Sequence, residues 1–125
     1  MIKVAVGILR RNGTVLVCQR KRGGRYELKW EFPGGKFEPG ETAEQCLCRE
    51  LHEELSIENV TIDRIEKQTA FYADGGLYEV TYCFVSAFGG HLRNNVFEDI
   101  RWVTPEELRS MDILDGNREI VRRLS

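Results

Sequence analysis

The chain has 125 residues, and we expect a single domain over residues 1–125 with one hydrophobic core. Hydrophobic residues make up 42% of it and charged residues 30%, values that exclude a disordered or fibrous protein. The net charge of −2 argues against a nucleic-acid polymer as partner, and no long uncharged apolar stretch predicts a membrane span.

The first third of the chain predicts three short strands. Residues 2–9 and 14–18 are rich in Val and Ile, and Asn12-Gly13 between them is a strong hairpin signal. Residues 30–32 predict a third strand that ends at Pro33. The loop before it carries four cationic residues, Arg20, Lys21, Arg22 and Arg25. They indicate either contact with a small anionic ligand or only a solvated hairpin.

A loop rich in Pro and Gly, residues 33–40, leads into the first helix. Thr42 and Gln45 have the spacing of a capping box, which predicts a helix that begins just after Thr42. Leu47, Leu51 and Leu55 recur every four residues and form an apolar stripe that faces the core.

The same helix carries three glutamates beside that stripe. Glu50, Glu53 and Glu54 fall within about 100° of arc, where like charges repel by a few tenths of a kcal/mol per pair. A hard cation such as Mg²⁺ prefers carboxylate oxygens, and it can bridge phosphate oxygens and activate a bound water. Arg49 stands next to this face and could orient a carboxylate through a bidentate pair. The alternative is a solvated acidic helix, which the helix alone does not exclude.

The second half of the chain predicts more strands and two helices. Residues 60–72 and 77–88 are two long strands joined by a Gly-containing loop, and Gly89-Gly90 ends the second. Residues 100–103 form another strand, and Thr104-Pro105 starts a short helix. A last helix covers about residues 117–124. The predicted fold class is α/β in the broad sense, more closely α+β, with a mixed sheet sandwiched between helices.

The four cysteines are Cys18, Cys46, Cys48 and Cys83. No Cys-x-x-Cys pair exists, and the two thiols of Cys46-x-Cys48 diverge on a helix. The N-terminal residues lack the order of a secretory signal peptide. We therefore predict a cytoplasmic protein whose cysteines are reduced, small, buried side chains.

The run from Gly35 to Ile57 also carries a family resemblance. Its fixed residues, at a spacing that resembles the Nudix box, are Gly35, Glu41, Arg49-Glu50-Leu51, Glu53-Glu54 and Ile57. One position departs: the family usually has Gly where this chain has Ser56, and Gly supplies a left-handed helix cap at lower cost. Residues 5–9, 15–20, 30–36 and Asn117 further resemble the MutT branch of the Nudix hydrolases.

The resemblance implies the roles of the site residues. A carbonyl of Gly34 or Gly35 would hold Mg²⁺ or Mn²⁺ together with Glu50, Glu53 and Glu54. Catalysis would rest on Arg49 and on Glu50 or Glu53 as general base. The implied substrate-binding residues are Arg20, Arg25, Glu31, Phe32, Pro33, Gly34, Asp74 and Asn117. Three alternatives stay open: Phe32 as a core residue, Asn117 as a helix N-cap, and Arg25 as an idle loop charge.

A further glutamate of the MutT branch is displaced in this chain. Counted back from Trp102, its position falls near Val96, whereas Glu98 follows two residues later. Either the loop shifts its register so that Glu98 binds the metal, or the site has one ligand fewer.

The expected function is Mg²⁺-dependent hydrolysis of (deoxy)nucleoside triphosphates to monophosphate and pyrophosphate, with oxidised guanine nucleotides such as 8-oxo-dGTP preferred. That activity would serve DNA replication and repair. The alternatives are CTP or another nucleoside-diphosphate-X as substrate, or a non-catalytic nucleotide-binding module. Tyr72 weakly favours dinucleoside polyphosphates. The partner would be a small nucleotide, with no membrane, and the protein a monomer or homodimer.

Overall fold

The computed structural model describes residues 1–71 and 75–125 of the chain. The strands are β1 (Ile2–Arg11), β2 (Thr14–Gln19), β3 (Trp30–Glu31), β4 (Gly34–Lys36), β5 (Ile57–Phe71), β6 (Leu77–Gly90) and β7 (Asp99–Val103). The helices are α1 (Ala43–Leu55), α2 (Pro105–Arg109), the 3₁₀ turn η1 (Asp115–Asn117) and α3 (Arg118–Arg123). Within the described residues no helix is long and apolar enough to cross a membrane.

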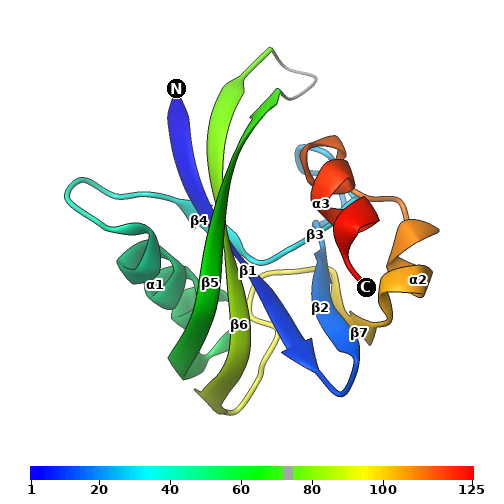
Figure 1. Cartoon of the computed structure of the whole chain (residues 1–125). Helices are drawn as coiled ribbons and strands as arrows, with labels where there is room; N and C mark the ends of the chain where they lie inside the picture. Colours follow the sequence, from blue (N-terminus) through cyan, green and yellow to red (C-terminus); the bar gives the residue numbers. More distant parts are fainter. Residues whose placement is uncertain (72–74) are drawn as a thin grey trace.

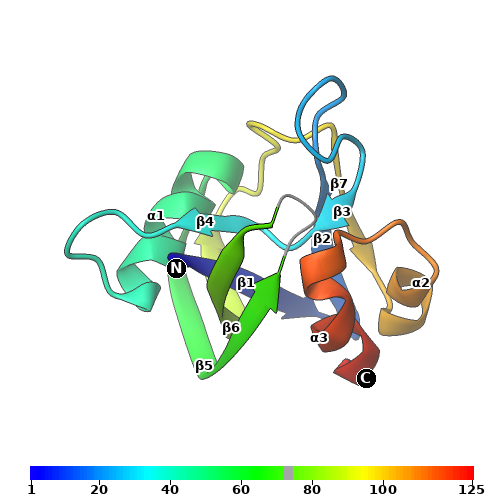
Figure 2. The same cartoon turned by 90° about the horizontal axis from the view of Figure 1, so that it is seen from above.

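Strand β1 stands at the centre of a mixed sheet. It runs parallel to β6 and antiparallel to β2 and β4, and the order along the sheet is β3-β2-β1-β6-β5, with β7 paired to β2. Helix α1 covers one side of the sheet, while α2 and α3 lie on the other (Figures 1 and 2). The predicted fold class, a mixed sheet between helices, is confirmed.

Two hydrophobic clusters hold these layers together. Successive side chains of a strand point to opposite faces, so Leu9 of β1 packs with the leucines of α1, whereas Ile8 packs toward α2 and α3. The predicted apolar stripe of α1 is fully buried in the first cluster (Leu47, Leu51 and Leu55). Both faces of the central strand are therefore covered, which fixes the register of the strands that surround the site.

Several predicted boundaries were wrong. Strand β5 begins at Ile57, directly after α1, and β6 continues through Gly90. The last helix begins at Arg118, after a 3₁₀ turn. Part of the predicted glycine loop forms β4, which pairs with residues 4–6 of β1. Tyr72 and Asp74, named in the sequence predictions, lie outside the described residues.

Strand β4 exists because two glycines permit close contact on both of its sides. A Cβ on Gly34, whose φ is +151°, would collide with the backbone of Ala5 in β1. A Cβ on Gly35 would overlap the carboxyl group of Glu50 on α1. Because glycine has no side chain, β1, β4 and the acidic face of α1 can lie in direct contact.

The four cysteines are free thiols, as predicted. Three of them, Cys18, Cys46 and Cys83, are buried, but Cys48 is exposed on α1, so the prediction of four buried side chains was wrong for that residue.

Candidate active site

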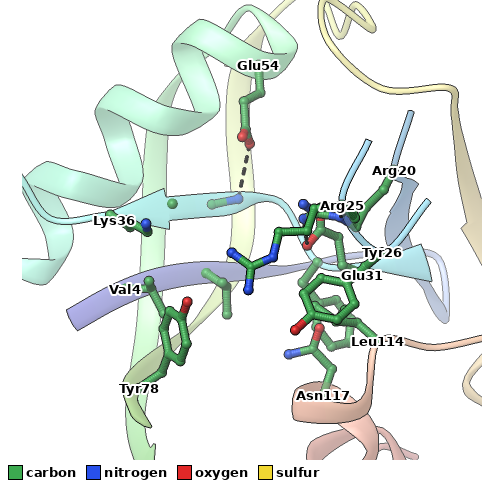
Figure 3. A pocket seen from close by; sticks show the side chains of 14 residues that line it. Val4, Arg20, Arg25, Tyr26, Glu31, Lys36, Glu54, Tyr78, Leu114 and Asn117 are labelled. Atoms are coloured by element: carbon green, nitrogen blue, oxygen red, sulfur yellow. Dashed lines mark hydrogen bonds and ion pairs between the residues drawn. The ribbon is translucent and has the colours of Figure 1, made fainter. Parts of the chain in front are cut away.

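A pocket of about 290 Å³ opens between the first half of β1, the loop before β3, the strand β4 and the η1 turn. Figure 3 shows Glu54 above β4 at one end of this pocket and Asn117 at the other. Its lining residues are Val4, Val6, Arg20, Arg25, Tyr26, Glu31, Phe32, Gly34, Gly35, Lys36, Glu54, Tyr78, Leu114 and Asn117.

Two carboxyl groups of α1 meet beside β4. The backbone N–H of Gly34 donates to Oε1 of Glu54 over 3.1 Å, and the side chain of Glu50, 16% exposed, lies against Gly35. The pKa of Glu54 is raised to about 9, mainly by burial and in addition by the neighbouring carboxyl groups of Glu50 and Glu31. A carboxyl group in such surroundings keeps its charge only when a cation balances it.

Arg49 is held rigidly next to this pair. Its Nε and Nη2 bind the two carboxylate oxygens of Glu41 at 2.7 and 2.9 Å, which is a bidentate pair. Its Nη1 donates to Glu50 over 2.8 Å, and its Nη2 also donates to the carbonyl of Lys36 over 3.1 Å. Hydrogen bonds from Arg49 lower the pKa of Glu41 to about 2. Arg49 thus orients Glu50 through a side chain that is itself fixed.

Glu53 has a different environment from its two neighbours. Its side chain is 57% exposed, and its carboxylate lies 3.4 Å from Nη1 of Arg49. In the described part of the chain, no three His, Cys, Asp or Glu side chains converge closely enough to hold a metal ion as they stand. The structure therefore brings Glu50 and Glu54 together and leaves Glu53 on the solvent side.

The end of α1 is fixed by a loop that comes much later in the chain. Ser56, at φ +59° and ψ +26°, adopts the left-handed cap conformation in which the family usually has Gly. Asn95 donates from Nδ2 to the carbonyl of Glu53 over 3.1 Å and to Oγ of Ser56 over 2.9 Å. The backbone N–H of Asn95 also donates to the carbonyl of Glu54. The last turn of the helix, which carries the glutamates, is therefore held in place.

These residues fit a divalent cation. The donor groups are carboxylate oxygens, which hard cations prefer, and the buried Glu50–Glu54 pair needs a positive charge to be fully ionised. Because Gly35 has no side chain, the carboxyl group of Glu50 lies directly against the backbone of β4. Glu50 and Glu54 would hold the ion, with a backbone carbonyl of Gly34 or Gly35 and with Glu53 after a change of rotamer.

The structure does not bring Glu98 to this group. Glu98 is exposed, and its Oε1 accepts a hydrogen bond from the backbone N–H of Arg22 over 3.2 Å. Val96 instead lines a second hollow, of about 260 Å³, together with Glu31 and Glu54. The register of this loop is fixed by the buried ring of Phe97 and by the bond from the Glu98 backbone N–H to the carbonyl of Gln19.

Arg20 and Glu31 form a pair within the pocket. Nη1 of Arg20 lies 3.1 and 3.2 Å from the two carboxylate oxygens of Glu31, and its Nε donates to the carbonyl of Arg25. Burial raises the pKa of Glu31, and the charge of Arg20 opposes that shift. Glu31, which was predicted to bind substrate, therefore holds Arg20 in place and offsets its charge.

The other predicted substrate residues differ in exposure. Phe32 is 3% exposed and belongs to the core, which confirms one interpretation of it. It also lines the pocket, and its contact with a base stays a prediction. Pro33 uses its carbonyl to accept a hydrogen bond from the backbone N–H of Gly7. Arg25 lines both hollows. Asn117 occupies the N-cap position of α3, but its side chain makes no capping hydrogen bond and instead donates from Nδ2 to Oη of Tyr82 over 3.1 Å.

Sequence reasoning missed six lining residues that the fold supplies: Val4, Val6, Tyr26, Lys36, Tyr78 and Leu114. Val4 and Val6 alternate along β1 with Ala5, which faces α1, and this period of two was the available signal. Tyr26 adopts a positive φ of +53° in the basic loop, a conformation that no local pattern indicated.

Comparison with known proteins agrees with this geometry. The chain matches the NUDIX domain over residues 1–124. It is 36% identical over 107 residues to the CTP pyrophosphohydrolase of Escherichia coli K12, covering 86% of this chain and 78% of that protein. It is 36% identical over 118 residues to the putative 8-oxo-dGTP diphosphatase 2 of Mycobacterium tuberculosis, covering 92% and 82%. The solution structure of the E. coli ORF135 protein superposes with a TM-score of 0.85 at 31% identity, covering 98% of this chain and 86% of that one.

Proposed function

The chain belongs to the NUDIX domain family, and from this premise we propose that it hydrolyses (deoxy)nucleoside triphosphates to monophosphate and pyrophosphate with Mg²⁺ or Mn²⁺. One domain over residues 1–125 would carry the whole activity. We further propose that its role is to remove oxidised guanine nucleotides from the cytoplasmic pool, before DNA replication or repair can use them. Its partner would be a free nucleotide, not a nucleic-acid polymer, and it would act as a monomer or homodimer.

The observation that carries this proposal is the Glu50–Glu54 pair beside β4, with Glu54 at one end of a pocket of about 290 Å³. Both carboxyl groups lie against the glycine strand β4, and the pKa of Glu54 is raised to about 9, mainly by burial. A solvated acidic helix would leave its glutamates in water at their ordinary pKa. The geometry therefore favours a binding site over that alternative.

The residues divide the chemical work between them. When bound, a divalent ion would stabilise charge on the phosphate oxygens and make a bound water more acidic. Glu53, which is exposed and next to the pair, would accept a proton as general base, and Arg49 keeps Glu50 in one orientation. Arg25 and Lys36, on the wall of the pocket, are cations that the triphosphate can approach.

The base would lie at the opposite end of the pocket. Phe32 and Tyr78, which line the pocket, offer apolar surface, and the amide of Asn117 offers hydrogen bonding. Asn117 and Glu54 lie at opposite ends of the pocket (Figure 3), an arrangement that suits a ligand with a base at one end and phosphates at the other.

A nucleotide panel tests the proposal. We would incubate the protein and Mg²⁺ with the four dNTPs, 8-oxo-dGTP, CTP and ADP-ribose, and identify the products by ³¹P NMR. We expect a monophosphate and pyrophosphate, and none of either without Mg²⁺ or in Glu53→Gln. Binding without release of products from any nucleotide would replace the proposal with a non-catalytic module.

CTP is the second candidate substrate, because one relative at 36% identity is named CTP pyrophosphohydrolase. The same panel separates the two candidates by kcat/KM. A value for CTP above that for 8-oxo-dGTP would assign the chain to cytidine nucleotides.

A further inference from the structure

Asn117 is linked to a buried tyrosine at the base end of the pocket. Tyr82 of β6 is 0% exposed, and its Oη donates to the backbone carbonyl of Gly116 over 3.2 Å. The same Oη accepts a hydrogen bond from Nδ2 of Asn117 over 3.1 Å. The side chain of Asn117 is itself 97% buried, since its residue is 3% exposed. Tyr82 does not line the pocket and would not touch a ligand there.

The single hydroxyl proton of Tyr82 determines which way the amide of Asn117 faces. A phenol has one proton to donate, and the carbonyl of Gly116 can only accept it. The remaining capacity of Oη is that of an acceptor, so the amide must present its N–H₂ side to Tyr82. Burial raises the pKa of Tyr82, which therefore keeps its proton at neutral pH. The opposite orientation would bring two acceptors, Oδ1 and Oη, together in the core.

The orientation has a consequence for the pocket. Asn117 begins the segment that leads into α3, and its amide points from there into the pocket (Figure 3). With one N–H of Nδ2 bound to Tyr82, the carbonyl oxygen Oδ1 is the atom of the amide that can accept a hydrogen bond from a ligand. A carbonyl oxygen accepts hydrogen bonds and repels the lone pair of another acceptor.

We propose that Tyr82 is a positioning residue that locks the amide of Asn117 with its oxygen toward the pocket, so that the site favours bases with an N–H donor at the facing position. This inference rests on the proposed function and deepens it. Two pairs of bases differ in the group that they could present to Oδ1 of Asn117. In the first pair, 8-oxoguanine has an N7–H donor where guanine has an N7 acceptor. In the second pair, cytosine has a 4-amino donor where uracil has an oxygen. The lock would favour the donor member of each pair.

Tyr82→Phe tests the lock, because it removes the hydroxyl and keeps the buried ring. We would measure kcat/KM for 8-oxo-dGTP against dGTP and for CTP against UTP, in the wild type and the variant. We expect the wild type to prefer the donor member of the pair that it hydrolyses. In Tyr82→Phe the preference should fall about fivefold, roughly the effect of one neutral hydrogen bond. The matched control is Thr81→Val, which deletes a buried hydroxyl from the adjacent position of β6.

The outcomes separate this inference from the proposed function. If the wild type hydrolyses no nucleotide, the proposed function fails. If the wild type discriminates and Tyr82→Phe keeps the same ratio, the lock is wrong. An equal fall of the ratio in Thr81→Val would also overturn it, since the effect would then be general loosening of β6.

A second variant keeps the test valid if Tyr82→Phe does not fold. Asn117→Asp has the same shape but only acceptor atoms, so under the lock it should keep the preference for the donor member of the pair. A reversed preference in Asn117→Asp would mean that the amide nitrogen, not the oxygen, contacts the base, and the inference would fail.

Discussion

Glu54→Gln should stabilise the metal-free protein at neutral and alkaline pH while it weakens metal binding. The folded state raises the pKa of Glu54 from 4.5 to about 9, chiefly by burial. Between these two values the folded state therefore holds a proton that the unfolded chain has released. The contribution of this proton to the free energy of unfolding is complete below about pH 4.5 and is lost as the pH rises toward 9.

The magnitude follows from this shift. One proton contributes about 1.4 kcal/mol per pH unit, or about 2.7 kcal/mol between pH 5.5 and 7.5. The carboxyl group is partly exposed and water screens it, so we expect about half of this, roughly 1.4 kcal/mol. Glutamine resembles the protonated acid and can still accept the hydrogen bond from Gly34, so the variant should lack this loss and exceed the wild type by that amount at pH 7.5.

Urea unfolding in EDTA at pH 5.5, 6.5, 7.5 and 8.5 measures the effect. The matched control is Glu53→Gln, which removes a charge from a side chain that is 57% exposed and should keep the pH dependence of the wild type. The reasoning is refuted if the free energy of unfolding of wild type and Glu54→Gln falls in parallel over this range. In the wild type, added Mg²⁺ should restore the loss at pH 7.5, because a bound cation replaces the proton.

Four other substitutions test separate parts of the site. Glu53→Gln should abolish turnover while the melting temperature stays within a few degrees of the wild type; a near-normal rate would remove Glu53 from catalysis. Asn117→Ala should narrow the gap in kcat/KM between 8-oxo-dGTP and dGTP by about tenfold, the scale of a base contact of roughly 1–3 kcal/mol, and an unchanged ratio would remove Asn117 from base recognition. Arg49→Lys should lower kcat about 100-fold with little change in KM, because lysine cannot make the bidentate pair; a rise in KM alone would point to substrate binding. Ser56→Gly relieves a left-handed φ but loses the bond from Asn95, so urea unfolding should show a change below about 1 kcal/mol, and a larger loss would make Ser56 the main anchor of α1.

The local parts of this fold could be predicted from the sequence, because the signals lie within a few residues. The capping box of Thr42 and Gln45 forms as expected, and the leucine stripe of α1 is buried. The fold class follows from the same periodic patterns. These features depend on helix and strand geometry alone.

Features that depend on distant parts of the chain could not be predicted. Strand β4 forms only because β1 lies beside it, and Glu54 differs from the exposed Glu53 because it is buried against β4, where it accepts a hydrogen bond from the backbone N–H of Gly34. The loop that carries Val96 and Glu98 takes its register from Gln19, 79 residues before Glu98. The contact between Tyr82 and Asn117 spans 35 residues of sequence.

The central claim is that the acidic face of α1 binds a divalent ion next to a nucleotide. A titration of Mn²⁺ followed by EPR, in the presence of a non-hydrolysable nucleoside triphosphate analogue, measures this directly. We expect the wild type to take up Mn²⁺ stoichiometrically and Glu50→Gln to lose most of that binding. Equal uptake by the wild type and Glu50→Gln, or none by either, would contradict the account.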